Sequence, residues 1–376
     1  MGPVELEPEK QQHQQQQLSI PKRQKAVVVE NAGPNATISV QETEVPLYGD
    51  DEVLIRLCYS SICHTDVAFA YGEWGQMGFG MTDGNRTPGH EGVGHVVAVG
   101  AKVDGEKFKV GDRVGTKWLR RVCGTCESCQ RGDEHLCAER TIYGHASPGS
   151  LQQYVASQAA TTPRIPDSLP LSKVGPLLCA GVTMFRALKK VQAASTGDWI
   201  AIAGAGGGLG HLGVQFARKM GFQVVGIDSG DKEDFCLFMG AHRFVDFRTT
   251  PDVPAAVRAV TGDSGGARGV LVPTGSPASY EQACKMLAPA GTLVCIGLPA
   301  GGPFTLPLPL LDIINSGYTV TGVNASRLQD IQDTLDFAAL HQILPMTERL
   351  PMGAAGEAFE RLKEAKVKGR IVLDLQ

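Results

Sequence analysis

The stretch from Trp199 to Asp228 restricts the fold more than any other part of this 376-residue chain. It begins with a short apolar run, Trp199 to Ala203, which is typical of a buried strand. Five glycines follow between Gly204 and Gly210. After them come a segment with helical spacing of apolar residues and a second apolar run, from Gln223 to Ile227, that leads directly into Asp228. This order predicts a βαβ unit of a parallel sheet.

The same stretch has the residues that a dinucleotide needs. Glycines allow the backbone to approach a pyrophosphate, and the N-terminus of the helix offers free N–H groups. We therefore expect the cofactor at Gly204, Gly207, Gly208, Leu209 and Gly210. Asp228 follows Gly210 by 18 residues, at the end of the second strand, where a carboxylate can bind a ribose diol and repel a 2′-phosphate. The pattern favours NAD over NADP, and a ligand-free turn is the less favoured alternative.

Composition excludes several classes of function. The net charge is −4 and there is no basic block, so a nucleic-acid partner is not expected. No apolar run approaches the ~20 residues that span a membrane, and the N-terminus has no signal-peptide pattern. We expect a cytoplasmic protein whose ten cysteines stay reduced.

The remaining chain divides into three kinds of segment. Residues 1–24 are polar and include a glutamine run, so we expect a disordered tail. Short strands with turns follow up to about residue 164 and predict a β-rich domain. Beyond a helix at 172–191, alternating elements predict a doubly wound parallel sheet: strands at 243–247, 269–272, 291–297 and 318–323, and helices at 253–260 and 279–287. Helices near 327–341 and 355–365 and a strand at 370–375 complete the chain and are expected to return to the first domain.

Four cysteines lie within fifteen residues, in the pattern Cys-x2-Cys-x2-Cys-x7-Cys. Cys123, Cys126, Cys129 and Cys137 can surround one Zn²⁺ tetrahedrally and fill its coordination shell. A closed shell leaves no position for a substrate, so this zinc is expected to be structural. Two disulfides and an iron–sulfur cluster are the alternatives, which the reducing compartment and the lack of a partner redox motif disfavour.

Two further motifs are dense in reactive side chains. They are Cys63-His64-Thr65-Asp66 and Gly89-His90-Glu91-Gly92, and Cys179 is a third candidate just before the nucleotide unit. Cys63, His90 and Cys179 would form a Cys2His zinc site with one open position. Spacing alone does not bring them together, because they lie far apart in the chain.

With these motifs, the chain from about Lys25 to its end resembles the zinc-dependent medium-chain alcohol dehydrogenases, in particular the yeast-type branch. The resemblance also rests on Gly369-Arg370. It implies an α/β protein with a GroES-like catalytic domain at 25–175 and 325–376, a zinc lobe at 118–140 and a Rossmann domain at 176–324. It further implies two zinc ions per chain, NAD, a small alcohol or aldehyde as substrate, and a homotetramer or homodimer.

The resemblance also implies roles for single residues. Cys63, His90 and Cys179 would hold the catalytic zinc. Asp66 would orient a ligand, Glu91 would reach the metal when the open position changes occupant, and Thr65 would take the proton of the alcohol. The other implied residues bind the cofactor, namely His64, Asp228, Lys232 and Arg370, or line the substrate pocket, namely Trp74, Trp118 and Leu298.

The sequence departs from the family pattern in two places. Ala68 stands where the family usually has the last histidine of its proton relay, so we expect proton release through water. Residues 75–89 are a few residues longer than in the yeast-type pattern, which argues against a narrow preference for ethanol. We expect the glycine-rich stretch Gly75 to Met81 near the mouth of the pocket, either as an inert loop or with a role in specificity. The resulting function is an NAD-dependent oxidation of primary alcohols. The alternatives are an aldehyde reductase for bulkier or aromatic aldehydes and a non-catalytic relative that binds zinc or nucleotide.

Overall fold

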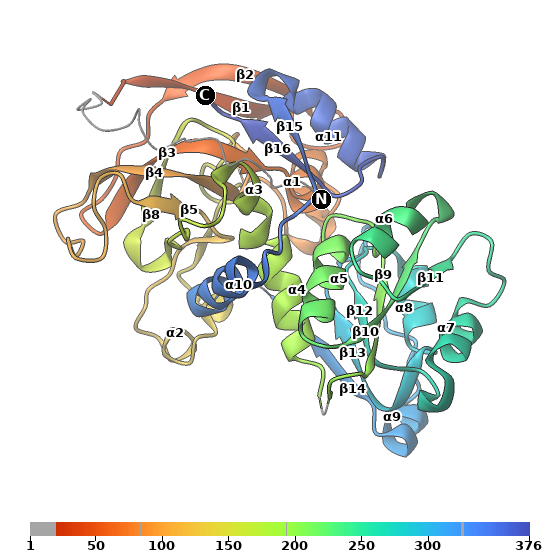
Figure 1. The fold of residues 1–376 in the computed structure, drawn as a ribbon. Coiled ribbons are helices and arrows are strands. Elements are labelled where there is room, and N and C mark those ends of the chain that lie inside the picture. Colours follow the sequence, from red (N-terminus) through yellow and green to blue (C-terminus); the bar gives the residue numbers. More distant parts are fainter. Residues whose placement is uncertain (1–19, 83, 193, 325–326) are drawn as a thin grey trace, which may run out of the picture.

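The computed structural model describes residues 20–376 except 83, 193 and 325–326. The expected tail at 1–24 therefore lies mostly outside the described residues. One part of the chain forms a six-stranded parallel sheet covered by helices, and the other part is rich in antiparallel strands (Figure 1). The expected α/β class is confirmed.

The parallel sheet is built around the glycine-rich unit. Its strands are arranged in the order β11-β10-β9-β12-β13-β14, and all pairs are parallel. The bounds are β9 (Trp199–Ala203), β10 (Gln223–Asp228), β11 (Arg243–Asp246), β12 (Ala267–Val272), β13 (Leu287–Cys295) and β14 (Thr319–Gly322). The chain reverses direction across the sheet between β9 and β12, which is where doubly wound sheets bind ligands.

Alternate side chains of the strands supply two cores. Ile200 and Ile202 pack into one core with helices on their face of the sheet, whereas Ala201, between them, packs into the other. The helices on the first face are α4 (Ala180–Lys189), α5 (Gly210–Lys219) and α10 (Leu328–His341). The helices on the second face are α7 (Val253–Thr261) and α8 (Pro277–Ala283). Both faces are thus buried, as the apolar strands predicted.

Two helix predictions were wrong in their extent. The helix at 279–287 ends at Ala283, and Leu287 instead begins β13 by pairing with Ala267. The helix at 172–191 is broken into α3 (Leu171–Val174), η4 (Gly175–Leu178) and α4. The break lies at Cys179, whose φ of −129° and ψ of −71° are not helical.

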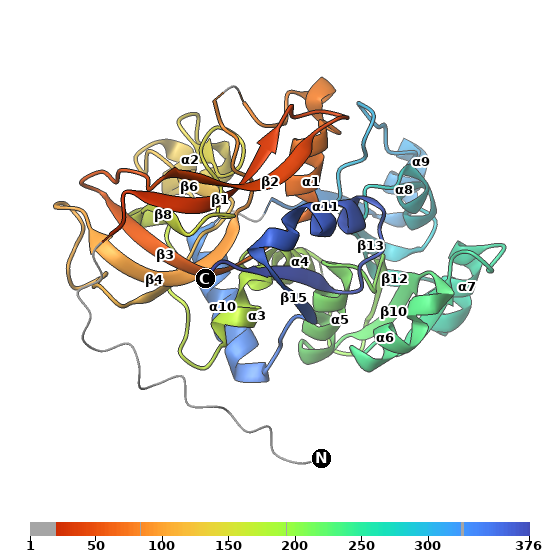
Figure 2. The ribbon, with the colours of Figure 1, turned by 90° about the horizontal axis from the view of Figure 1, so that it is seen from above.

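The second sheet joins distant parts of the chain. Its strand order is β15-β16-β3-β4-β5, and β8 also pairs with β3. The bounds are β3 (Glu52–Ser61), β4 (Glu91–Val99), β5 (Arg113–Gly115), β8 (Tyr154–Gln158), β15 (Thr347–Pro351) and β16 (Arg370–Asp374). The C-terminal strand β16 pairs antiparallel with β3, through Val372 and Ser61 among others. Seen from above, β15 and α11 (Ala355–Lys363) lie between the strands β1 (Arg23–Glu30) and β2 (Thr37–Glu44) and the helices of the parallel sheet (Figure 2).

Smaller elements complete the fold. β1 and β2 form an antiparallel pair, and β6 and β7 form another. The strands and helices are β1 (Arg23–Glu30), β2 (Thr37–Glu44), β6 (Leu119–Arg121), β7 (Thr141–Ile142), α1 (His64–Tyr71), α2 (Glu127–Gln130), α6 (Glu233–Phe238), α9 (Leu310–Ser316) and α11 (Ala355–Lys363). The 3-10 turns are η1 (Gly75–Met77), η2 (Glu134–Leu136), η3 (Ala159–Thr161), η5 (Gly230–Lys232), η6 (Gly262–Ser264) and η7 (Met352–Ala354). Strands β2, β6, β7, β8 and β15 were not predicted individually.

Within the described residues, no single helix has the length and apolar composition of a membrane span. The helical segments Leu171–Leu178 and Ala180–Lys189 reach this length and apolar composition only when they are taken together, and a bend of 49° separates them.

Candidate active site

The four cysteines of the Cys-x2-Cys-x2-Cys-x7-Cys motif form a compact cluster. The sulfur atoms of Cys123, Cys126, Cys129 and Cys137 all lie within 4.8 Å of one another. A tetrahedral Zn²⁺ with Zn–S bonds of about 2.3 Å requires sulfur separations of about 3.8 Å, and the Cys123–Cys129 and Cys123–Cys137 separations are 3.9 and 3.6 Å. All ten cysteines are free thiols, which argues against the disulfide alternative. The residues fit a bound zinc.

Backbone groups prepare this lobe for a metal. The N–H of Cys126 lies 3.3 Å from the Cys123 sulfur, and with the N–H of Thr125 it lowers the pKa of the Cys123 thiol to about 6. The thiolate, which is the form that binds metal, therefore predominates at neutral pH. Leu119, Val122 and Ile142 form a small buried cluster under the cysteines.

The three residues proposed for the second metal site come together from separate elements. Cys63 precedes α1, His90 precedes β4, and Cys179 lies at the break before α4. Their ligand atoms, with a carboxylate oxygen of Glu91, lie within 4.8 Å of one another. The His90 Nε2 atom is 3.3 Å from the Cys179 sulfur. Cys63 and His90 are buried, so the set is enclosed on the protein side.

Asp66 orients two of these residues. Its Oδ1 atom accepts hydrogen bonds from His90 Nδ1, at 2.9 Å, and from the Gly89 N–H, at 3.1 Å. Its Oδ2 atom accepts from the Cys63 N–H at 2.8 Å. Burial by itself lowers the pKa of His90, but the Asp66 carboxylate and the Cys63 sulfur together raise it. Because Nδ1 is used by Asp66, the Nε2 lone pair is the one available to a metal.

A buried ion pair connects this cluster to the glycine turn. Arg370 Nη2 lies 2.5 Å from Glu91 Oε1 and also contacts Glu91 Oε2, which Ser61 Oγ contacts as well. Burial raises the pKa of Glu91, and the Arg370 charge partly offsets this. Glu91 Oε1 is 4.0 Å from His90 Nε2. The carboxylate is therefore held by Arg370 beside the cluster.

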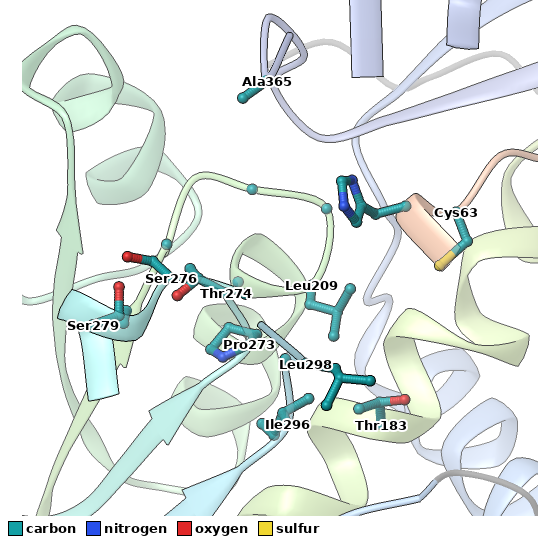
Figure 3. Close-up of a pocket in the computed structure, with 18 of the residues that line it drawn as sticks. Cys63, Thr183, Leu209, Pro273, Thr274, Ser276, Ser279, Ile296, Leu298 and Ala365 are labelled. Atoms are coloured by element: carbon teal, nitrogen blue, oxygen red, sulfur yellow. The ribbon is translucent and has the colours of Figure 1, made fainter. Parts of the chain in front are cut away.

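A cavity of about 700 Å³ joins the cluster to the glycine turn. It is lined by all nine predicted cofactor residues, namely His64, Gly204, Gly207, Gly208, Leu209, Gly210, Asp228, Lys232 and Arg370. Cys63 and Cys179 open onto it, whereas His90, Asp66 and Glu91 lie behind its wall. Figure 3 shows Leu209, Leu298 and Thr183 between Cys63 and the opposite side, where Ser276 and Ser279 lie.

The glycine turn has no room for side chains. A Cβ atom on Gly210 would lie 2.0 Å from the Gly204 carbonyl oxygen, and Gly204 itself has a φ of +67°. Asp228 Oδ2 accepts from the Gly206 N–H at 2.9 Å, and Lys232 Nζ lies 3.3 Å from Asp228 Oδ1. Asp228 is thus fixed at the tip of β10, facing the turn.

His64 contributes a basic group at the cavity. Its Nε2 atom lies 3.2 Å from Glu73 Oε2, and this hydrogen bond raises the pKa of His64. The imidazole is therefore more readily cationic than a free histidine, as suits a group near a pyrophosphate.

The end of the cavity beside Cys63 is aromatic. Trp74, Trp118 and Leu298, which were predicted to line a substrate pocket, all line this cavity, and Thr65 Oγ1 lies 3.7 Å from the Cys63 sulfur. The Trp118 ring stands edge-on to His90, with ring centroids 5.2 Å apart. Phe69, which was not predicted, packs against both tryptophans at 6.1 and 5.8 Å. Its position in α1, one turn after Thr65, was the available signal.

His211, at the start of α5, is a second residue whose role was not predicted from the sequence. It is fully buried, donates from Nδ1 to the Gly207 carbonyl at 2.8 Å, and accepts at Nε2 from the Met346 N–H at 3.2 Å. Burial lowers its pKa to about 4. The Met346 carbonyl in turn accepts from the Arg370 N–H at 2.9 Å. His211 thus ties the glycine turn to the segment that carries Arg370.

Comparison with known proteins gives a consistent set of relatives. The family model described as alcohol dehydrogenase GroES-like domain matches residues 49–167, and that described as zinc-binding dehydrogenase matches residues 208–339. Alcohol dehydrogenase 2 of Emericella nidulans is 41% identical over 364 residues, covering 95% of this chain and 98% of that protein. The alcohol dehydrogenase of Schizosaccharomyces pombe is 38% identical, covering 95% and 99%. The solved structure of a cinnamyl alcohol dehydrogenase from Sorghum bicolor superposes with a TM-score of 0.82 at 31% identity, covering 94% and 98%.

Proposed function

The chain belongs to the zinc-dependent medium-chain alcohol dehydrogenase family, and on that premise we propose that it oxidises primary alcohols to aldehydes with hydride transfer to NAD, and reduces aldehydes with NADH. The observation that carries the proposal is the cluster of Cys63, His90 and Cys179 at one end of the cavity that also contains the glycine turn. An alcohol at this cluster and a nicotinamide beside the glycine turn would lie in the same cavity.

We assign two zinc ions to each chain. Cys63, His90 and Cys179 would hold the catalytic ion, and the four cysteines of the lobe would hold the structural ion. Zinc at the first site supplies Lewis acidity, which makes an alcohol hydroxyl more acidic. NAD supplies the hydride acceptor.

The chain's own residues position the reactants and move the proton. Thr65, beside Cys63, accepts the proton from the alcohol hydroxyl. Ala68 is buried and carries no titratable group, so water takes the proton onward from Thr65. Asp66 keeps His90 in one orientation, and Arg370 pairs with the Glu91 carboxylate, which lies beside the position that zinc would occupy.

Asp228 carries the preference for NAD. A carboxylate at the tip of β10, next to the Gly206 N–H, suits a ribose diol and repels a 2′-phosphate. We predict that Asp228→Asn raises the KM for NAD by roughly 10- to 100-fold, because hydrogen bonds to a charged group are lost, and narrows the preference over NADP. Asp246→Asn is the matched control, since Asp246 pairs with Asp228 in register but does not line the cavity. Equal effects of both substitutions would contradict this role.

The test of the function is NADH formation over a panel of primary alcohols, with the zinc content measured on the same sample. We expect turnover with NAD and two zinc ions per chain. The second candidate, a non-catalytic relative, predicts one zinc and no turnover. It is disfavoured by the complete Cys63–His90–Cys179 set.

We further propose that two copies of the chain pair through the outer edge of the parallel sheet, within a homodimer or homotetramer. β14 is the last strand of that sheet, and Leu310, Leu311 and Ile314 on the adjacent helix α9 are 70%, 66% and 67% exposed. Apolar side chains gathered at an unpaired strand suit an interface between copies. Light scattering should give a dimer or tetramer mass. A monomer mass would reject the proposal.

A further inference from the structure

The loop at residues 75–89 contributes an aromatic side chain to the cavity. Phe79 lines the same cavity as Cys63, Thr65 and Trp74, and 40% of its surface stays exposed. Trp118 packs on His90, and Phe69 packs on both Trp118 and Trp74. Phe79 is therefore an outer wall of the pocket, between the inner aromatic residues and solvent.

The backbone of the loop fixes where Phe79 lies. The Trp74 carbonyl accepts from the N–H groups of Met77, at 2.9 Å, and Phe79, at 3.2 Å. Gly78, between them, has a φ of +76°, which turns the chain back after η1. These bonds hold the backbone of Phe79 next to that of Trp74.

A histidine from a distant segment holds the loop from the other side. His145 Nδ1 contacts the Gly80 carbonyl, and the His145 carbonyl accepts from Thr82 N, Thr82 Oγ1 and Asn85 Nδ2 at 3.2, 3.0 and 3.0 Å. The His145 ring packs on Phe69, with centroids 5.7 Å apart. The loop is thus bonded to the aromatic cluster that it covers.

The loop also meets the cofactor-binding part of the molecule. A side chain on Gly302 would lie 3.5 Å from Gln76 Oε1. Gly302 belongs to the segment that follows β13 and leads to α9. The loop therefore lies where the two parts of the chain face each other across the mouth of the cavity.

Resting on the proposed function, we infer that Phe79 is a specificity-determining residue and that the pocket is suited to primary alcohols with an extended apolar or aromatic tail. The hydroxyl of such an alcohol lies at the metal cluster, and its tail passes the inner aromatic residues and ends against Phe79. A two-carbon alcohol does not reach the outer wall. Phe79 stabilises bound long alcohols and leaves short ones unaffected, while His145 acts as a positioning residue.

The test compares kcat/KM for ethanol, 1-hexanol and benzyl alcohol at saturating NAD. Phe79→Ala should lower the 1-hexanol to ethanol ratio by about tenfold, the size of one lost aromatic contact, with ethanol itself changed less than about twofold. Phe238→Ala is the matched control, because this phenylalanine is 77% exposed on α6 and does not line the cavity. The control should leave the ratio unchanged.

A second pair of variants tests the positioning residue. His145→Ala should lower the same ratio, and His145→Gln, which keeps a donor for the Gly80 carbonyl, should restore it. An unchanged ratio in Phe79→Ala, or an equal loss for ethanol and 1-hexanol, would overturn the inference and leave the proposed function standing. Zinc-loaded wild-type protein that oxidises none of the three alcohols would overturn both.

Discussion

The two clusters of metal-binding residues in this protein are built in opposite ways. The four cysteines of the lobe come from one segment of fifteen residues and rest on a small cluster of their own. Cys63, His90 and Cys179 come from three segments, and the last two are 89 residues apart. The first arrangement needs only a local fold, whereas the second needs both parts of the molecule in place. The lobe should therefore affect stability, and the catalytic cluster should affect turnover.

The largest effect is expected at the catalytic cluster. His90→Ala removes a ligand and the partner of Asp66, so kcat should fall by at least about 10³-fold, since the metal contributes several kcal/mol to the transition state. The zinc content should fall by one ion per chain, with the thermal midpoint within a few degrees of wild type. Metal analysis, stopped-flow kinetics and calorimetry measure these three quantities. A variant that loses both ions or unfolds would remove the distinction between the two clusters.

The next largest effect is expected in the four-cysteine lobe, where a substitution should lower stability and leave turnover intact. Cys126→Ser should lower the thermal midpoint by roughly 5–10 °C, because loss of a structural metal is among the most destabilising single changes. The kcat of the folded fraction, per catalytic zinc, should stay within about twofold. Calorimetry and active-site titration test this. A kcat loss as large as that of His90→Ala, in protein that remains folded, would show that the lobe takes part in the chemistry.

A smaller effect concerns acid stability near the glycine turn. The folded pKa of His211 is lowered by burial to about 4, against an ordinary value of 6.5. Between pH 6.5 and 4, His211 is therefore protonated in the unfolded chain and neutral in the folded chain. The free energy of unfolding is highest above pH 6.5 and decreases as the pH falls toward 4. The loss amounts to about 3 kcal/mol. This loss of stability arises at the glycine turn, where His211 lies, and not at either cluster of proposed metal ligands.

The test compares wild type with His211→Asn, which has no titrating group, in urea unfolding between pH 7 and 4.5. Both proteins carry the same metals, so their difference isolates His211. The variant should start less stable, because the Met346 N–H loses its acceptor, and should lose less stability on acidification. Parallel curves would contradict the assignment.

The sequence predicted the features that are built from one local segment, and it did not by itself predict those that combine distant segments. The βαβ unit from Trp199 to Asp228 and the four-cysteine motif are local, and spacing alone predicted them. The catalytic cluster required the family resemblance, because no spacing rule connects Cys63 to Cys179. Strands β2, β8 and β15 were missed because they lack a strong apolar run or a turn signal, and their pairing with distant strands decides their conformation. The break at Cys179 was missed because the flanking residues keep helical spacing.

The residues that sequence reasoning missed in the site share one property. Phe69, Phe79 and His211 are apolar or uncharged groups whose roles depend on neighbours far along the chain. A phenylalanine in a helix or a histidine after a glycine has many possible positions, and only the tertiary fold selects one. Signals existed in the longer 75–89 segment and in the position of His211 in the first turn of α5.

The pairing of Arg370 with Glu91 spans 279 residues, and that of Met346 with His211 spans 135. A chain that emerges from the ribosome N-terminus first can assemble the cysteine lobe early, from a segment that is complete by Cys137. The support for Glu91 has to wait for β16, which is synthesised long after the lobe and the glycine turn. A nascent chain can therefore fold the four-cysteine lobe long before the support for Glu91 is in place, so competence for the reaction is gained only after β16 has been synthesised.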